Sequence, residues 1–461
     1  MYRLIIFVIS LSLFGCGGTS GGTATAVVAS TPSFLDSGTS LTYSSTNATT
    51  LAASREFQNF NYRATSTQNP LEVINAHKAY GYGLTGSGQT IAIMDTGLSS
   101  NHQEFSDKTI TTFGTLDAAN GVSISGDHGI AVASIAAAEN DDNAVGDGGT
   151  VQGVAPSADL HLSSYNKING NSYFPTHWAN ATDNASSAVV QNNSWGVDYK
   201  VDTLKSDISS NGWTNDYGVA QKWNSAGYTA NEASATAYIS SLNNFQDHGV
   251  IVYALSNTHS YTDADFQAAL PELFSQLKEA WITAVNVEIT GSSGSETYTR
   301  TSAPCGSTGA YCLGADGFGI TAAGMNELTN GIGSGYWEND KDNNSTIIAG
   351  TSYVAPQISG AVALLSEAFP THTPAQLTDR LLASADNTFF NHDAVVTFGN
   401  GVKHGYDDEF GHGILDIYAA LNPITSSSDN RSMRLYTGDS FNDNSSFQLG
   451  NSRILTSSSF G

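Results

Sequence analysis

The stretch that most constrains the fold runs from Ile347 to Phe369, where an apolar run turns into a helix at Ser352. Most residues after Ser352 are small or apolar, a pattern typical of a buried helix packed tightly between other elements. Gly350 and Thr351 permit a sharp turn, and a helix start supplies free N–H groups and the positive end of a dipole. Ser352 is therefore either a nucleophile beside half of an oxyanion site or simply a capping serine.

A carboxylate and a histidine precede Ser352 along the chain. The β-rich run Gln89–Met94 is bounded by glycines and predicts a strand, and Asp95 follows it directly. Functional groups gather at the carboxyl ends of parallel strands, so Asp95 is expected at that edge. His128 stands in the first turn of a second helix of small residues, GIAVASIAAA. Taken alone, Asp95 could cap a turn and His128 could be structural.

Three stretches together resemble the motifs of the subtilisin-like serine proteases (the subtilase family, peptidase family S8). They are MDTG at Asp95, GDHGIAVAS around His128 and GTSYVAP around Ser352, in the subtilase order Asp, His, Ser. The resemblance extends over roughly Leu71–Leu421 and implies a serine endopeptidase that works through an acyl-enzyme. HGIAVAS replaces the usual HGTHVAG, a departure that alters the packing around His128 and leaves the triad intact.

The resemblance also implies a role for each of these residues. His128 would take the proton of Ser352, while Asp95 would hold the required tautomer and stabilise the imidazolium. Asn257 follows the strand-like run Val250–Leu255, where subtilases carry the asparagine that completes the oxyanion hole. Without the resemblance, a turn asparagine after a strand would be the simpler interpretation.

Substrate is expected to bind as an added extended strand. The resemblance to the family's substrate-binding edge suggests that Ser194, Trp195 and Gly196 bind the peptide main chain. Trp195 could equally belong to the core. Leu255 and Ser256 are expected to line the pocket for the residue before the cleaved bond, and Ser256 replaces the family's usual glycine and would narrow that pocket. The sequence does not indicate which substrate side chain this pocket prefers.

Composition limits the partners. The chain carries 42 acidic and 17 basic residues, a formal net charge of −25. Such a surface repels phosphate backbones, so we expect no nucleic-acid partner. The expected partner is a polypeptide substrate, and the expected state is a monomer.

We expect no cofactor and assign no metal site. Asp340, Asp342 and Asn344 alternate like a calcium loop, but the following glycine and the distal glutamate are missing, which favours a solvated loop. The acidic stretch Glu139–Gly149 lies where some subtilases bind calcium. A structural calcium site therefore stays an open alternative, and we assign no ligands to it.

The N-terminus predicts export. Within residues 1–15, Arg3 is followed by an apolar run that has the size of a signal-peptide core and is too short to span a bilayer. Gly15 and Cys16 resemble a bacterial lipoprotein cleavage site, so Cys16 is predicted to be lipidated, with ordinary signal cleavage as the alternative. A lipid anchor would be the only membrane attachment. The expected location is the bacterial outer membrane, the cell surface or the medium.

Composition also suggests the domain boundaries. Residues 16–66 are rich in Gly, Ser, Thr and Ala without a sustained period, and we expect a flexible tether there. Residues 67–424 form the expected peptidase domain, and 425–461 a polar tail.

Cys305 and Cys312 share one short loop and, in an exported protein, predict a disulfide.

The fold class follows from alternation of strands and helices. Expected strands near 89–94, 158–163, 188–194, 250–255 and 281–287 alternate with helical or loop segments. This pattern predicts an α/β fold with a mainly parallel sheet and helices on both faces, the three-layer subtilisin-like arrangement. The helix 231–247 leading into 250–255 is the clearest crossover, and Thr373 with Pro374 predicts a further helix start.

Two other interpretations stay open. The chain could be a catalytically weak surface binding protein on the same scaffold, because fold alone does not establish function. It is also similar to the passenger domains of autotransporter subtilases and could be a passenger fragment, since no C-terminal run of barrel strands is present. The intact triad together with Asn257 favours the enzyme.

Overall fold

The computed structural model describes residues 33–61, 68–116, 128–141, 151–165, 174–326, 331–338 and 348–425. Several sequence predictions lie outside these ranges: the signal peptide, Cys16, the polar tail after residue 425, most of Glu139–Gly149, and Asp340, Asp342 and Asn344. Within the described ranges, none of the helices combines the length and the apolar character that a membrane span requires.

The described strands form one large sheet and two small ones. The large sheet has the order β2-β3-β1-β4-β5-β6-β7, with β8 also paired to β6. Its strands are β1 Thr90–Asp95, β2 Ile110–Phe113, β3 Asp159–Ser164, β4 Val190–Asn193, β5 Val250–Ala254, β6 Trp281–Thr290, β7 Thr297–Arg300 and β8 Cys312–Ala315. The small antiparallel pairs are β9 Ala322–Asn326 with β10 Gly331–Glu338, and β11 Ala394–Thr397 with β12 Lys403–Tyr406.

Every pairing in the large sheet is parallel except that of β6 with β7. The carboxyl ends of β1, β4 and β5 therefore lie at one edge of the sheet. Asp95 is the last residue of β1, and Ser194 and Leu255 directly follow β4 and β5. The register alone thus brings three predicted site segments to one edge.

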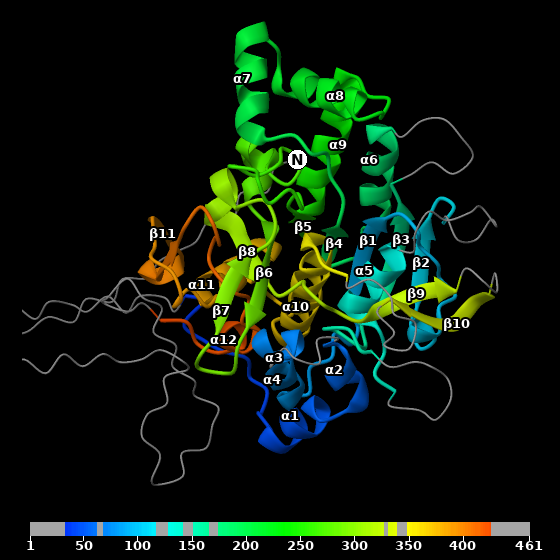
Figure 1. Ribbon diagram of the computed structural model, residues 1–461, viewed down its shortest axis with the longest axis vertical. Helices are drawn as coiled ribbons and strands as arrows, with labels where there is room; N and C mark the ends of the chain where they lie inside the picture. Colours follow the sequence, from blue (N-terminus) through cyan, green and yellow to red (C-terminus); the bar gives the residue numbers. More distant parts are fainter. Residues whose placement is uncertain are drawn as a thin grey trace, which may run out of the picture. The chain divides into compact units, whose positions relative to one another are not determined.

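Helices cover both faces of the sheet (Figure 1). In chain order the α-helices are α1 Ser45–Ala52, α2 Arg55–Asn59, α3 Pro70–Val73, α4 Ala76–Gly81, α5 His128–Ala137, α6 Pro175–Asn184, α7 Val201–Asn211, α8 Asn215–Ser225, α9 Glu232–Phe245, α10 Ala355–Ala368, α11 Pro374–Ser384 and α12 Ile417–Leu421. Helices α6 to α9 gather at the top of Figure 1, and α1 to α4 lie at the bottom.

Two hydrogen bonds show which helix covers which face. Asn192 of β4 accepts from the hydroxyl of Ser359 in α10 at 3.1 Å. Tyr253 of β5 shares a 2.5 Å hydrogen bond with Tyr238 of α9. Asn192 and Tyr253 are offset by one residue in the register of these neighbouring strands, so their side chains point to opposite faces. Helices α10 and α9 therefore cover opposite faces, and the predicted three-layer fold class is confirmed.

The predicted elements match the structure closely. Strands β1, β3, β4, β5 and β6 agree with the expected ranges to within three residues at every end. Helix α11 begins after Thr373, which forms a capping box with Gln376. Helix α9 begins after Asn231, which caps it in the same way through Ser234. The sequence predicts these elements correctly because helix capping and strand periodicity depend on residues that are close together in the chain.

The predicted tether is wrong for the part of it that the structure describes. Residues 33–61 contain α1 and α2, and Leu35, Phe57 and Phe60 are fully buried in the common core. Helix α1 packs against α4. The apolar residues of this segment are too sparse to show a period in the sequence. Their burial depends on surfaces supplied from elsewhere in the chain.

Arg380 of α11 joins the two ends of the described chain. Its guanidinium is buried and donates to four backbone carbonyls: those of Phe34 at 2.7 Å, Ser37 at 3.0 Å, Ala420 at 2.7 Å and Asn422 at 2.8 Å. Burial lowers the pKa of Arg380 to about 10. The segment near residue 35 is thus held by hydrogen bonds whose donor lies more than three hundred residues away.

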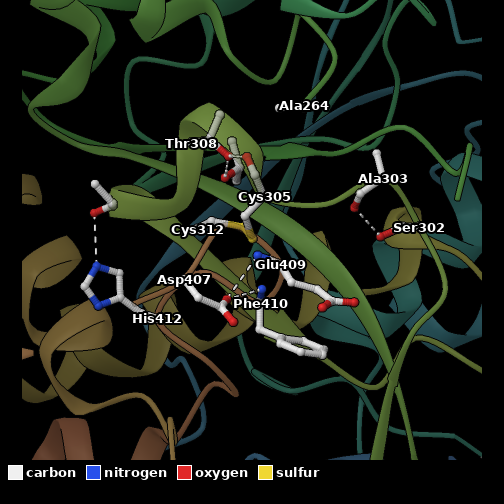
Figure 2. The surroundings of a disulfide bond; sticks show 12 residues. Ala264, Ser302, Ala303, Cys305, Thr308, Cys312, Asp407, Glu409, Phe410 and His412 are labelled. Atoms are coloured by element: carbon white, nitrogen blue, oxygen red, sulfur yellow. Dashed lines mark hydrogen bonds between the residues drawn. A yellow bond between two sulfur atoms is a disulfide. The ribbon is translucent and has the colours of Figure 1, made fainter. Parts of the chain in front are cut away.

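The predicted disulfide joins Cys305 to Cys312, and both cysteines are buried (Figure 2). Glu409 and Phe410 lie beside it, and Asp407 accepts hydrogen bonds from the backbone N–H groups of both. Closing so short a loop stabilises the fold by about 2.5 kcal/mol in the chain-entropy model. The disulfide therefore ties the start of β8 to the loop that follows β7.

Candidate active site

Asp95 and His128 form the first half of the site. Asp95 is the last residue of β1, and His128 is the first residue of α5. The Nδ1 atom of His128 lies 2.8 Å from Oδ1 of Asp95. The Asp95 side chain is 1% exposed, whereas the imidazole is 33% exposed. Asp95 therefore accepts a hydrogen bond from Nδ1–H of His128, which leaves Nε2 as the ring nitrogen that can accept a proton.

The backbone around Asp95 fixes the direction of this carboxylate. The backbone N–H of Thr96 donates to the same Oδ1 atom at 2.7 Å. Gly129 follows His128 and donates its N–H to the Thr96 carbonyl at 2.7 Å. A Cβ at Gly129 would lie 2.6 Å from that carbonyl oxygen, so the residue after His128 must be glycine. The start of α5 is thereby joined directly to the end of β1.

Ser352 lies in a 3₁₀ turn, η6 Thr351–Tyr353, and α10 begins only at Ala355. The prediction that Ser352 opens the helix is therefore wrong by one short turn. Ser352 is 8% exposed. The aromatic ring of Tyr353 lies 6.0 Å from the imidazole of His128, measured between centroids, so η6 and the start of α5 are neighbours.

Two hydrogen bonds join Ser352 to the end of β4. The hydroxyl of Ser194 donates to the Ser352 carbonyl at 3.0 Å. The hydroxyl of Ser352 donates to the Ser194 carbonyl at 3.3 Å. Ser194 also accepts at 2.9 Å from the side chain of Asn192, so its side chain is held from both sides. The predicted substrate edge and the predicted nucleophile thus form one connected unit.

Asn257 lies beside this turn with a fixed orientation. Its Oδ1 atom accepts from the backbone N–H of Thr351 at 3.0 Å and lies 3.1 Å from the Thr351 hydroxyl, which is also 2.5 Å from the Leu255 carbonyl. Because Oδ1 is occupied, the Nδ2 group is the part of the amide that can donate to a ligand. A Cβ at Gly350 would lie 3.1 Å from Oδ1, which explains the glycine there.

The predicted substrate residues share one cavity with Ser352, the predicted nucleophile. The cavity has a volume of about 180 Å³. Its lining contains Ser194, Trp195, Gly196, Val197, Asp198, Ala254, Leu255, Ser256, Asn257, Asp265, Thr351 and Ser352. All of the residues predicted for the peptide main chain and the adjoining pocket are therefore brought together beside Ser352.

The side chain of Trp195 belongs to the core. The residue is 7% exposed, and its ring stacks on Tyr165 with centroids 4.5 Å apart. It also packs against Trp178 of α6 at 4.8 Å. Of the two interpretations left open by the sequence, core packing describes the ring, and the main chain of Trp195 is the part left for a substrate.

Three residues of the site were missed by the sequence analysis: Thr351, Asp198 and Asp265. Thr351 belongs to the GTSYVAP stretch, so its position next to Ser352 could have identified it. Asp198 follows the predicted substrate edge by two residues, so its position could also have identified it. Asp265 stands in a segment without a motif, and only the fold brings it to the cavity. Burial raises the pKa of Asp265 to about 7.

The family model of the subtilases matches residues 86–413, a range that contains Asp95, His128, Asn257 and Ser352. The chain belongs to the subtilase family. This subtilase is 28% identical to an extracellular serine protease of Serratia marcescens, an alignment that covers 76% of this chain and 33% of the relative. It is 26% identical to fervidolysin of Fervidobacterium pennivorans, covering 76% of this chain and 43% of the relative. The chain thus spans well under half the length of these relatives.

A solved structure supports the fold. The crystal structure of fervidolysin, described as a keratinolytic enzyme related to subtilisin, superimposes with a TM-score of 0.50 at 20% identity. The superposition covers 76% of this chain and 45% of that one. The likeness shows the same α/β architecture, and the chemistry of this chain rests on its own site.

Proposed function

We propose that this subtilase is a serine endopeptidase that hydrolyses peptide bonds through Asp95, His128 and Ser352. The observation that carries the proposal is the 2.8 Å contact between Asp95 Oδ1 and His128 Nδ1, at the sheet edge where Ser352 also lies. A buried carboxylate that orients an imidazole beside a serine is the arrangement that activates a hydroxyl. The proton transfers need no cofactor, because His128 carries each of them.

The first step requires a rotation of the Ser352 hydroxyl. In the structure it donates to the Ser194 carbonyl at 3.3 Å, a long and weak hydrogen bond. Turning toward Nε2 of His128 would place its proton on the base, and such catalytic hydrogen bonds often tighten only when substrate binds. Attack on the scissile carbonyl then gives the acyl-enzyme, and His128 returns the proton to the leaving amine. Water completes the hydrolysis by the same route.

Negative charge on the carbonyl oxygen would be stabilised by two donors. One is Nδ2 of Asn257, which the Thr351 hydrogen bonds to Oδ1 leave available to a ligand. The other is the backbone N–H of Ser352, close to the positive end of α10. Such donors act on charge that develops in the transition state, so their effect falls on kcat.

Export and lipid anchoring complete the proposal. One relative is an extracellular protease, which supports an exported location for this chain. The sequence LFGC further supports attachment of lipid to Cys16, which would hold the peptidase domain at a membrane surface. A lipoprotein carries several acyl chains, and stable anchoring requires more than one.

The triad is tested by covalent labelling. A fluorophosphonate should modify Ser352 in the wild-type protein, because the probe needs an activated serine, and His128→Ala should abolish the reaction. The modified peptide is identified by mass spectrometry. His248→Ala is the matched control, since His248 precedes β5 at the opposite edge of the sheet and should leave labelling unchanged. An unlabelled wild-type protein would contradict the proposal and favour a binding protein on this scaffold.

The orientation of Asn257 is tested at Thr351. Thr351→Val removes the hydroxyl that contacts Leu255 and Asn257 and keeps the backbone hydrogen bond. If Asn257 is less well oriented, the transition state should lose about 1–2 kcal/mol of stabilisation. This loss should lower kcat roughly 5- to 30-fold with little change in KM. Thr351→Ser retains the hydroxyl and should restore most of the rate. A lower melting temperature with unchanged kcat in Thr351→Val would show that Thr351 is only structural.

The anchor is tested in a bacterium that processes lipoproteins. The full chain should sediment with membranes and carry a lipidated N-terminal cysteine, detected by mass spectrometry. Cys16→Ser should release the protein or block its processing, and Ser20→Ala should behave as the wild type. A mature N-terminus beyond Cys16 in the wild-type protein would refute lipidation.

A further inference from the structure

The cavity beside Ser352 contains two carboxylates that neither the triad nor the oxyanion site uses. Asp198 follows the substrate edge Ser194–Gly196, and Asp265 lies in the segment between β5 and β6. Both line the same cavity as the nucleophile. Because Ser352 lines the cavity together with Leu255 and Ser256, we assign the side chain that enters it to the residue before the cleaved bond, the P1 residue.

Ser256 holds both carboxylates in place. Its backbone N–H donates to Oδ2 of Asp265 at 2.7 Å, and its hydroxyl donates to Oδ1 of Asp198 at 2.5 Å. Ser256 directly precedes Asn257. The two carboxylates are therefore both hydrogen-bonded to the residue that precedes the proposed oxyanion donor, so their distances to a bound substrate are set together.

The two carboxylates differ in their exposure to solvent and to a ligand. Asp265 is 2% exposed, and its Oδ1 accepts from the backbone N–H of Ala268 at 3.1 Å. Gly196 brings the cavity wall close to it, since a Cβ there would lie 3.5 Å from that oxygen. Asp198 is exposed, and its Oδ2 accepts no hydrogen bond from the residues that the structure describes. Asp198 therefore offers a carboxylate oxygen to a ligand, and Asp265 adds negative charge from a buried position in the cavity wall.

Among the residues that the structure describes, no basic side chain lines the cavity to balance this charge. Lys200 is directed to Asp202 at 3.3 Å and to Thr262 at 3.0 Å, and Arg300 pairs with Glu409. Burial raises the pKa of Asp265 to about 7, and the like charge of Asp198 adds to the rise. A cation placed in the cavity would relieve both effects.

The geometry points to a P1 pocket for arginine or lysine, so that the enzyme cleaves after basic residues. This inference rests on the proposed function, because the cavity selects substrates only if Ser352 attacks them. The aliphatic stem would lie along Ala254 and Leu255, and the cationic head would reach Oδ2 of Asp198. A neutral P1 side chain would leave the carboxylates desolvated without a partner, and an acidic one would be repelled.

A structural role for the carboxylates makes a different prediction. If Asp198 and Asp265 only hold Ser256, removing the charge of Asp198 would change stability and leave selectivity as it is. Selectivity between P1 side chains therefore separates the two roles.

The test uses peptidyl diphenyl phosphonates that differ only in their P1 side chain: Arg, Lys, Leu and Glu. Each reagent forms a bond to the activated serine, so its labelling rate reports how the cavity receives the side chain. We expect the Arg reagent to label Ser352 at least about tenfold faster than the Leu reagent, with Lys intermediate and Glu slowest. Asp198→Asn should lower the Arg-to-Leu ratio about tenfold without slowing the Leu reagent. Asp247→Asn, at the opposite edge of the sheet before β5, is the matched control and should not change the ratio.

A simple fluorophosphonate without a P1 side chain is run beside these reagents. If it labels Ser352 and the Arg reagent is no faster than the Leu reagent, the inference is overturned and the proposed function stands. An Arg preference that survives in Asp198→Asn likewise overturns the assignment to this carboxylate. If the simple fluorophosphonate itself fails, the proposed function fails first.

Discussion

The contact between Thr351 and Asn257 is the constraint on which the rest of the site depends. The 3₁₀ turn that carries Ser352 comes from the segment before α10, whereas Asn257 comes from the end of β5, almost one hundred residues earlier. Thr351 joins them through its N–H and its hydroxyl, and Gly350 leaves the space for the approach. Without this junction the proposed nucleophile Ser352 and the proposed oxyanion donor Asn257 would have no fixed distance, and the joint action that we propose on one carbonyl group requires one.

The parallel sheet supplies the remaining geometry. Strands β1, β4 and β5 end at one edge, which places Asp95, Ser194 and Ser256 at that edge. The direction in which each side chain points then distinguishes the three carboxylates there. Asp95 points to His128 and orients it, whereas Asp198 and Asp265 face the cavity and set its charge. In our proposal, one sheet edge thus carries both the chemistry and the selection of substrate.

The sequence predicted what local chemistry determines and missed what only the fold brings together. Strands, capping boxes and the three motifs are local signals, and the elements they predicted are present. The burial of Phe57 and Phe60 depends on distant surfaces, so a segment without periodicity was mistaken for a tether. Asp265 reaches the cavity through a connection without any motif, and no spacing in the sequence could indicate it. The role of Thr351 depends equally on an amide supplied by β5.

The most direct test of the account is a crystal structure of the protein after reaction with a fluorophosphonate. The tetrahedral phosphorus resembles the transition state of acyl transfer, so its oxygen reports where negative charge is received. We expect phosphorus bonded to Oγ of Ser352 and the phosphonyl oxygen within hydrogen-bonding distance of both Nδ2 of Asn257 and the Ser352 N–H, with Thr351 still bound to Oδ1. An adduct on another residue, or a phosphonyl oxygen directed away from Asn257, would contradict the account.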